Sequence, residues 1–191
     1  MKRHRSLRGK LVVLCFLISC PGCVTSDVYF EPDMDFGSLQ TVAVLPFQNL
    51  SGDEQAAGRV RDTFTGMLLA TEALYVLHPG EVARAISRAG GLPPEGPSTE
   101  RIKKLSSILE VDAVITGVLR EYRAVRSCST SANVVSLSLQ MIEVSSGKII
   151  WSAASTKGGI TPWDRLFGGG GKPMNTVTEK VVDDLLDKLF D

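Results

Sequence analysis

The chain has 191 residues, and its 21 basic side chains equal its 21 acidic ones in number. The charges are unevenly placed, because residues 1–19 carry five basic side chains and no acidic one, which leaves 16 basic against 21 acidic residues in the rest. That remainder shows no basic stripe able to follow a phosphate backbone, so we expect no nucleic-acid partner.

The amino terminus has the organisation of a secretory signal. Five basic residues lie within the first ten positions, and residues 11–18 form an unbroken apolar run. This run is too short for the ~20 residues that a membrane-spanning helix needs. A basic segment followed by a short apolar one is typical of a signal peptide, so we expect residues 1–19 to be removed.

The apolar run ends in the sequence LISC at residues 17–20. This segment resembles the bacterial lipobox, which implies cleavage before Cys20 and lipidation of that cysteine. Cys23 is the alternative, although the CPG sequence before it fits a lipobox less well. An ordinary secretory signal is the other alternative, and it does not explain why a small residue and a cysteine end the run together. The same resemblance implies acylation of the palmitate type, and stable anchoring by lipid takes more than one acyl chain.

The lipid would hold the protein on the periplasmic face of an envelope membrane. By analogy with enteric lipoproteins, the absence of aspartate after Cys20 implies the outer membrane, although Pro21 at this position is unusual. We divide the chain into a signal peptide (1–19), a lipidated amino terminus with a short tether (20–38) and a folded domain (39–191). A flexible tether of this length spans about 20 to 25 Å.

Two cysteines remain after the signal and the lipidated residue, Cys23 and Cys128. In an oxidising compartment they could form a disulfide. A free Cys128 in a polar loop is the alternative, because distance in sequence says nothing about distance in space.

The rest of the sequence predicts an α/β fold with a mixed sheet. Apolar or alternating segments predict strands at residues 41–47, 73–77, 113–119, 135–141 and 149–153. Apolar residues at helical spacing predict helices after residue 51, at 81–89, at 98–109 and from about 175. The order β-α-β-α-α-β-β-β-α indicates a single domain with helices packed on the sheet.

Local signals refine these predictions. Ser51 and Glu54 have the spacing of a capping box before the first helix, and Thr176 and Glu179 have it before the last. Two glycines at 90 and 91 should end the second helix. Residues 123–133 predict a polar loop, and residues 145–148 predict the turn between the last two strands.

Three segments carry a family resemblance: TVAVLPFQNLSGDE (41–54), VDAVITGVL (111–119) and VSLSLQMIEVSSGKIIWSA (135–153). They resemble the periplasmic domain shared by the curli secretion lipoprotein CsgG, the penicillin-binding-protein activator LpoB and the amino-terminal domain of TolB. The resemblance spans about residues 39–190, and its third segment is the most specific. It implies a binding or assembly module rather than an enzyme.

Two departures from that family narrow the expectation. A curli-type channel needs membrane strands of about 9 to 11 residues, and residues 124–133 are few and polar, while residues 157–174 are rich in glycine. A pore is therefore disfavoured. The synthase activator carries a long linker, whereas the short tether here argues against reaching a synthase in the opposite membrane.

The sequence shows no catalytic, metal or cofactor signature. The glycine-rich segment 167–173 lacks the hydroxyl residue and the preceding strand of a phosphate-binding loop. His78 is the one histidine beyond the signal, reads as a surface turn residue, and cannot by itself form a zinc site or a catalytic triad. Asp183, Asp184 and Asp187 indicate a solvated helix face, with an acidic partner surface as the alternative.

One segment suggests a contact with a partner. Ile160, Trp163, Leu166 and Phe167 lie in a stretch bounded by glycines, where few side chains should be buried. Exposed aromatic residues favour protein or membrane contact. The alternative is that they fold back over the edge of the sheet as a lid.

These observations predict a membrane-anchored lipoprotein that binds an envelope protein, or further copies of itself, in assembly or regulation. The alternative is an oligomeric component of a curli-type secretion or outer-membrane assembly system. The identity of the partner is not encoded in a pattern that the sequence alone reveals.

Overall fold

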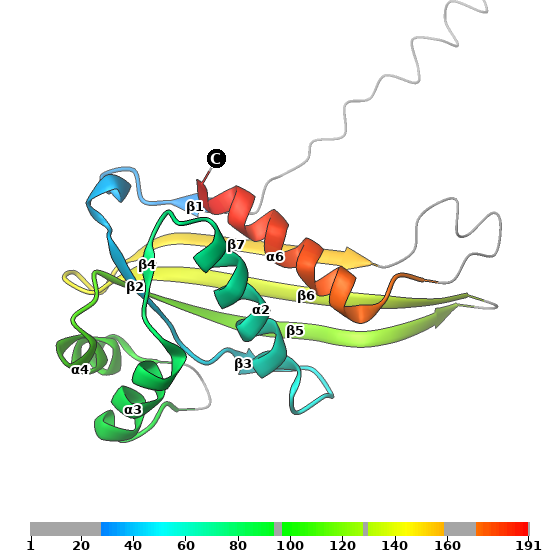
Figure 1. Cartoon of the computed structure of the whole chain (residues 1–191), viewed down its shortest axis with the longest axis horizontal. Helices are drawn as coiled ribbons and strands as arrows, with labels where there is room; N and C mark the ends of the chain where they lie inside the picture. Colours follow the sequence, from blue (N-terminus) through cyan, green and yellow to red (C-terminus); the bar gives the residue numbers. More distant parts are fainter. Residues whose placement is uncertain (1–27, 94–96, 128–129, 159–170, 191) are drawn as a thin grey trace, which may run out of the picture.

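The computed structural model describes residues 28–93, 97–127, 130–158 and 171–190 (Figure 1). Among these residues, one sheet has the strand order β1-β7-β6-β5-β2-β4, with β3 beside β5. Its strands are β1 (Val28–Phe30), β2 (Thr41–Val44), β3 (Gln48–Asn49), β4 (Tyr75–Val76), β5 (Ala113–Ser127), β6 (Thr130–Glu143) and β7 (Ile149–Gly158). The helices are η1 (Phe36–Ser38), α2 (Ala56–Ala70), α3 (Pro79–Ala89), α4 (Thr99–Leu109) and α6 (Met174–Phe190).

The sheet is mixed, as predicted. Strand β2 runs parallel to β4 and β5, while β5, β6 and β7 form an antiparallel meander, and β1 joins β7 in antiparallel pairing. The described helices and strands thus confirm a single mixed α/β domain. No described helix has the length and apolar character needed to cross a membrane.

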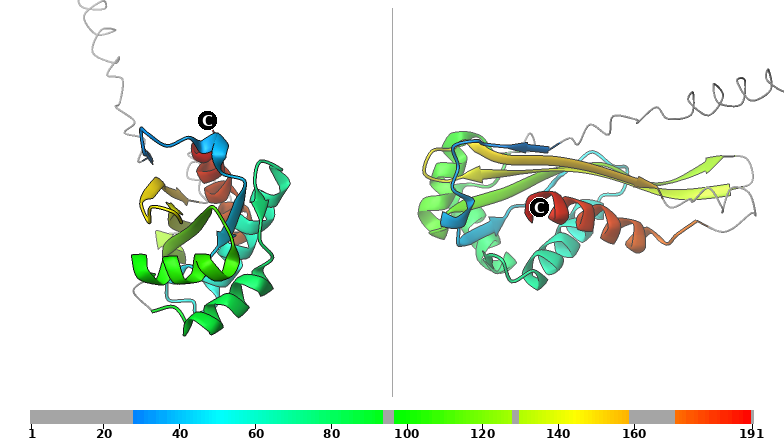
Figure 2. Two further views of the ribbon diagram at one scale, coloured as in Figure 1. Left: turned by 90° about the vertical axis from the view of Figure 1, so that its left-hand side faces the viewer. Right: turned by 90° about the horizontal axis from the view of Figure 1, so that it is seen from above.

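Helices α2 and α6 lie side by side on one face of the sheet (Figures 1 and 2). The strands turn large apolar side chains toward them, including Ile115 and Leu119 from β5 and Leu137 and Leu139 from β6. Trp151 of β7 is fully buried there, and its indole N–H donates a hydrogen bond of 3.0 Å to the backbone oxygen of Lys188. Period-two alternation in the strands therefore builds the main core.

Helices α3 and α4 cover only one end of the opposite face (Figure 1). They bury a smaller cluster that includes Ala43, Leu45, Val114 and Ile142. Gly90 ends α3 with φ at 91°, a conformation that favours glycine. Because these helices are short, the rest of this face lies beyond their reach.

The folded domain begins earlier than the sequence predicts. Val28 pairs with Ala153, and the N–H of Glu31 donates to the oxygen of Ile150 at 2.9 Å, so residues assigned to the tether belong to the sheet. Asp35 then caps η1 by accepting from Gly37 N–H at 3.0 Å. Three strand residues at a sheet edge carry too little periodicity to be recognised. The spacer between Cys20 and the sheet therefore has about half the predicted length or less.

The predicted polar loop at residues 123–133 is wrong. Strand β5 continues to Ser127 and β6 begins at Thr130, with the two residues paired. This hairpin extends past the helices (Figure 2), and none of residues 121–125 and 131–134 has a fully buried side chain. Strand ends that bury few side chains can have the polar composition of a loop, which explains the error.

Two predicted capping boxes are also wrong. Helix α2 begins at Ala56 after Gln55, which makes no side-chain cap, while the hydroxyl of Ser51 donates to Asn49 Oδ1 at 2.7 Å. Helix α6 already begins at Met174, so Thr176 lies inside it. The hydroxyl of Ser51 thus stabilises the loop before α2 instead of the first turn of the helix.

Candidate functional site

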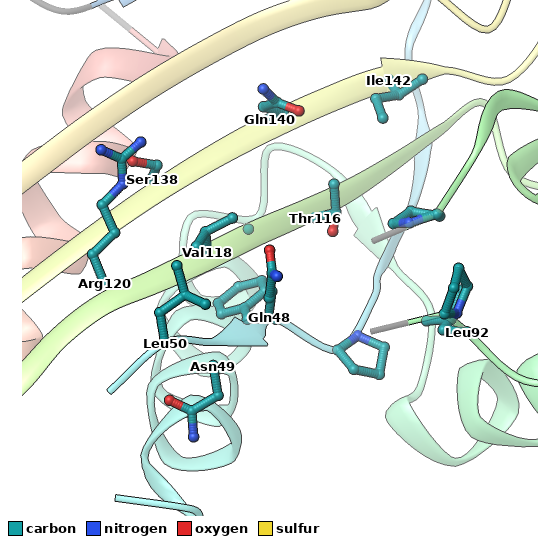
Figure 3. Close-up of a pocket in the computed structure, with 15 residues that line it drawn as sticks. Gln48, Asn49, Leu50, Leu92, Thr116, Val118, Arg120, Ser138, Gln140 and Ile142 are labelled. Carbon is teal, nitrogen blue, oxygen red and sulfur yellow. The ribbon is translucent and has the colours of Figure 1, made fainter. Parts of the chain in front are cut away.

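A groove of about 680 Å³ lies on the face of the sheet that α3 and α4 leave open (Figure 3). It is formed by the loop after β2, the end of α3 and the central strands β5 and β6. Its polar lining consists of Gln48, Asn49, Thr116, Arg120, Ser138 and Gln140, and its apolar lining includes Pro46, Phe47, Leu50, Leu92, Pro93, Pro97, Val118 and Ile142.

The alternation of β5 and β6 explains why this face is polar. Residues that face the main core are large and apolar, whereas their neighbours in sequence are Thr116, Ser138 and Gln140. Side chains of this kind tolerate solvent and offer hydrogen-bond donors and acceptors. The groove can therefore form hydrogen bonds with a polar backbone or side chain.

The floor of the groove depends on the close approach of Gly117 and Phe47. A Cβ at position 117 would lie 2.5 Å from Cδ2 of Leu139, 2.8 Å from the oxygen of Ser138 and 3.3 Å from Phe47 Cδ1. Phe47 in turn packs against Phe64 with ring centroids 6.0 Å apart. Glycine thus allows the loop after β2 to close onto the strand.

A hydrogen-bond network fixes the loop that carries Leu50. The side-chain N–H of Asn49 donates to the oxygen of Asp53 at 2.8 Å, and Asn49 Oδ1 accepts from Ser51 N–H at 3.0 Å. The N–H of Leu50 donates to Leu119 O at 2.9 Å. This loop holds Leu50 at the rim of the groove with 60% of its surface exposed. A large apolar side chain held in this way is suited to a protein contact.

The described lining of the groove carries a net positive charge. Arg120 lines it beside Ser138 (Figure 3), and none of its described lining residues is acidic. The described lining also contains no histidine or cysteine. Its chemistry is that of amides, hydroxyls, one guanidinium and apolar surface, which suits binding.

A second charged feature lies where α6 crosses β7. Asp184 accepts hydrogen bonds from Lys157 of β7 and from Lys188, the latter at 2.9 Å. Partial burial would raise the pKa of Asp184, but the hydrogen bonds from the two lysines outweigh it and lower the pKa to about 2. Asp184 is therefore a paired carboxylate, which corrects the prediction that it lies on a solvated face, whereas Asp183 and Asp187 are exposed as predicted.

His78 takes the predicted surface position and also caps a helix. Its Nδ1 accepts from Gly80 N–H at 3.1 Å at the start of α3, and the residue is exposed. The structure thus gives this histidine a local structural role that helix-start signals could have indicated.

The predicted lipidation and contact residues lie outside the described part of the chain. These are Cys20 and its alternative Cys23, the second disulfide candidate Cys128, and the contact candidates Ile160, Trp163, Leu166 and Phe167. Sequence reasoning missed the groove, because its lining comes from four separate segments. The spacing of Lys180, Asp184 and Lys188 was a signal for the charged feature.

Fold and groove together define the class, a small mixed α/β domain with α2 and α6 on one sheet face and α3 and α4 over one end of the other. The family model described as "Putative lipoprotein GNA1162-like" matches residues 36–191, so the chain belongs to the GNA1162-like family. No curated protein matches the sequence. The more specific resemblance to CsgG and TolB receives no support from these comparisons.

Solved structures share the fold at low sequence identity. The PelC dodecamer from Paraburkholderia phytofirmans has a TM-score of 0.57 and 16% identity over 86% of this chain and 97% of that chain. Lipoprotein GNA1162 from Neisseria meningitidis has a TM-score of 0.54 and 20% identity over 78% and 99%. The LpoB C-terminal domain from Salmonella enterica has 0.49 and 14% over 76% and 93%. For PelC and GNA1162, whose TM-scores exceed 0.5, the similarity at these identities shows the fold alone.

Proposed function

We propose that the protein is a lipid-anchored envelope lipoprotein whose domain is an assembly module, binding through its open groove to another protein, with a second copy of the chain as the first candidate. The observation that carries this proposal is the groove itself, a polar-lined surface with Leu50 fixed and exposed at its rim. Membership of a family described as lipoproteins supports the anchor.

The fold supports a second copy as the partner. A chain with this fold forms the PelC dodecamer. In our protein, the hairpin of β5 and β6 extends past the helices, so it can reach a neighbouring domain (Figure 2). Its edge carries Arg120 and Arg123, and charged side chains on an exposed edge discourage unspecific strand pairing.

We place the protein on the periplasmic face of the outer membrane. The support is the lipobox at residues 17–20 and the absence of aspartate at position 21. Only seven residues lie between Cys20 and Val28, and the eight steps from one to the other span at most about 26 to 29 Å when fully extended. A partner should therefore lie close to the same membrane, which disfavours direct activation of a synthase in the opposite one.

The binding role, rather than catalysis, is supported by the chemistry of the groove. Its described residues offer amides, hydroxyls and apolar surface. Such a lining provides hydrogen bonds and shape, and it resembles the polar and apolar mixture of protein interfaces.

A photo-crosslinking amino acid at position 50 tests the proposal in cells, with the same substitution at Leu69 as the control. Both leucines are exposed, Leu50 to 60% and Leu69 to 50%, but Leu69 lies on α2, outside the groove. We expect adducts at multiples of the chain's own mass from position 50 and fewer from position 69. Equal or absent crosslinking at the two positions would contradict a role for the groove. Adducts with a different protein would keep the binding role and reject the second copy.

A further inference from the structure

The amino-terminal spacer leaves the sheet beside the charged feature on α6. Val28, the first described residue, pairs with Ala153 of β7. The next residue of that strand, Ala154, accepts a hydrogen bond of 2.9 Å from the Nζ of Lys188. The segment that leads to the lipid therefore starts next to Lys188. Because this segment is short, the lipid on Cys20 must lie close to Val28.

Four lysines lie along this side of α6. Lys180, Asp184 and Lys188 lie at intervals of four residues, so they share one face of α6. Lys157 reaches the same face from the end of β7 through its pairing with Asp184. Lys172 precedes α6 and is held on the sheet, because its backbone oxygen accepts from Asn133 Nδ2 at 2.8 Å.

The cluster carries more positive charge than its own carboxylate can balance. Four lysines face one aspartate, which leaves a net charge of about three. The neighbouring ammonium of Lys172 lowers the pKa of Lys180, and Lys157 adds to this effect. Such mutual repulsion indicates a site that an anion would stabilise.

The cluster contains most of the lysines of the mature chain. Only seven lysines follow residue 19, and four of them are in the cluster, although that part of the chain has five more acidic than basic residues. Two other acidic residues of α6, Asp183 and Asp187, line a crevice with α2 residues such as Met67 and Thr71. Helix α6 thus separates a basic side toward β7 from an acidic side toward α2.

We propose that the lysine cluster, formed by Lys157, Lys172, Lys180 and Lys188, faces the membrane that holds the lipid and contacts the headgroup phosphates of anionic phospholipids. The inference rests on the proposed lipid anchor. A short spacer keeps its exit point near the lipid surface, and lysines bind phosphate as compact charges. Charges act over only about 8 Å at physiological ionic strength, so the cluster must lie against the surface to contribute.

The test uses the mature lipidated chain in vesicles of phosphatidylcholine alone or mixed with phosphatidylglycerol. A water-soluble amine-acetylating reagent is added, and mass spectrometry follows each lysine over time. Lys180 and Lys157 report on the cluster, and Lys103 on α4 is the internal control, since it is an exposed helical lysine outside the cluster. Flotation of the vesicles and the mass of the amino-terminal peptide establish the anchor independently.

We expect acetylation of Lys180 and Lys157 to be slower on the anionic vesicles by about fivefold, the factor that one lysine near such a surface contributes. Lys103 should react at the same rate on both. Lys180→Glu should weaken the protection of Lys157, whereas Lys103→Glu should leave it unchanged.

Three outcomes would overturn the inference in distinguishable ways. Equal rates on both vesicles, with the chain acylated and floating, would reject the headgroup contact and leave the anchor intact. Protection in detergent that increases with protein concentration would show that another copy covers the lysines. A chain that neither floats nor carries acyl mass would reject the proposed anchor and the membrane contact together.

Discussion

The carboxylate of Asp112 accepts hydrogen bonds from the backbone N–H of Thr41 at 2.8 Å and from its hydroxyl at 2.9 Å. The N–H of Gln40 adds a third bond at 2.9 Å. Asp112 immediately precedes β5 and Thr41 begins β2, so one carboxylate fixes the start of two parallel strands 71 residues apart in sequence. The hydrogen bonds from Gln40 and then Thr41 lower the pKa of Asp112.

Asp112→Ala should therefore destabilise the domain by about 1 to 2 kcal/mol, because three donors lose a charged acceptor at a partly solvated site. Urea unfolding would measure the change. A carboxyl whose pKa is lowered by folding stabilises the native state above its ordinary pKa, and this contribution disappears as the pH falls through the folded-state value. The difference between the variant and the wild type should therefore narrow in acid. Asp33→Ala, at another exposed aspartate, is the control and should change little.

Gly117→Ala should destabilise the domain by about 1 to 3 kcal/mol through overpacking. The added methyl would lie 2.5 Å from Leu139 Cδ2 and 2.8 Å from a backbone oxygen, so the strand pairing must shift. Thermal unfolding would report the loss.

Gly66→Ala provides the matched control for that substitution. Gly66 lies within α2, and a Cβ there would meet no other atom within 4 Å. Alanine restricts the unfolded chain and favours the helix, so we expect a gain of about 0.5 to 1 kcal/mol. Equal changes in stability from the two substitutions would show that the neighbours of Gly117 leave room for a methyl group.

Sequence patterns predicted most of the fold because burial imposes them. Residues 113–115 are all apolar, since their strand is covered on both faces at that end, and the helices keep an apolar row at helical spacing. Strand segments that bury few side chains lack such patterns, and the sequence did not predict them. Strand β1 has three residues at a sheet edge, and the outer part of the β5–β6 hairpin, residues 121–125 and 131–134, has no fully buried side chain.

The candidate site was less predictable, because proximity between distant segments leaves no local pattern. Gln48, Leu92 and Gln140 meet in one groove although none is part of a motif. Lys157 and Asp184 meet across 27 residues. The spacing of Lys180, Asp184 and Lys188 predicted that they share one helix face. The same spacing is equally typical of an ordinary solvent-exposed face, so it did not identify the cluster.

Asp184→Asn should reduce stability at neutral pH by about 2 kcal/mol or less, because Lys157 and Lys188 lose their charged partner. The folded-state pKa of Asp184 is about 2, below the ordinary value of 3.8. Its contribution should therefore be complete above about pH 4 and decline between pH 4 and pH 2. Unfolding by urea across this range would reveal the difference. Asp183→Asn, at the adjacent exposed carboxylate, should show no comparable decline, and a similar pH profile for both would argue against the pairing.

Cys20→Ala should abolish membrane association, whereas Cys23→Ala should retain it. The two cysteines lie three residues apart, so the pair separates loss of the acylated residue from a general effect on secretion. Mass spectrometry of the mature chain from a lipoprotein-competent bacterium should show acyl chains on Cys20 and cleavage before it. Two or more chains are expected, since one chain anchors only weakly. Acylation at Cys23 would leave only four residues between the lipidated cysteine and Val28 and bring the lysine cluster still closer to the membrane. An unmodified wild-type chain would instead reject the anchor on which the membrane orientation depends.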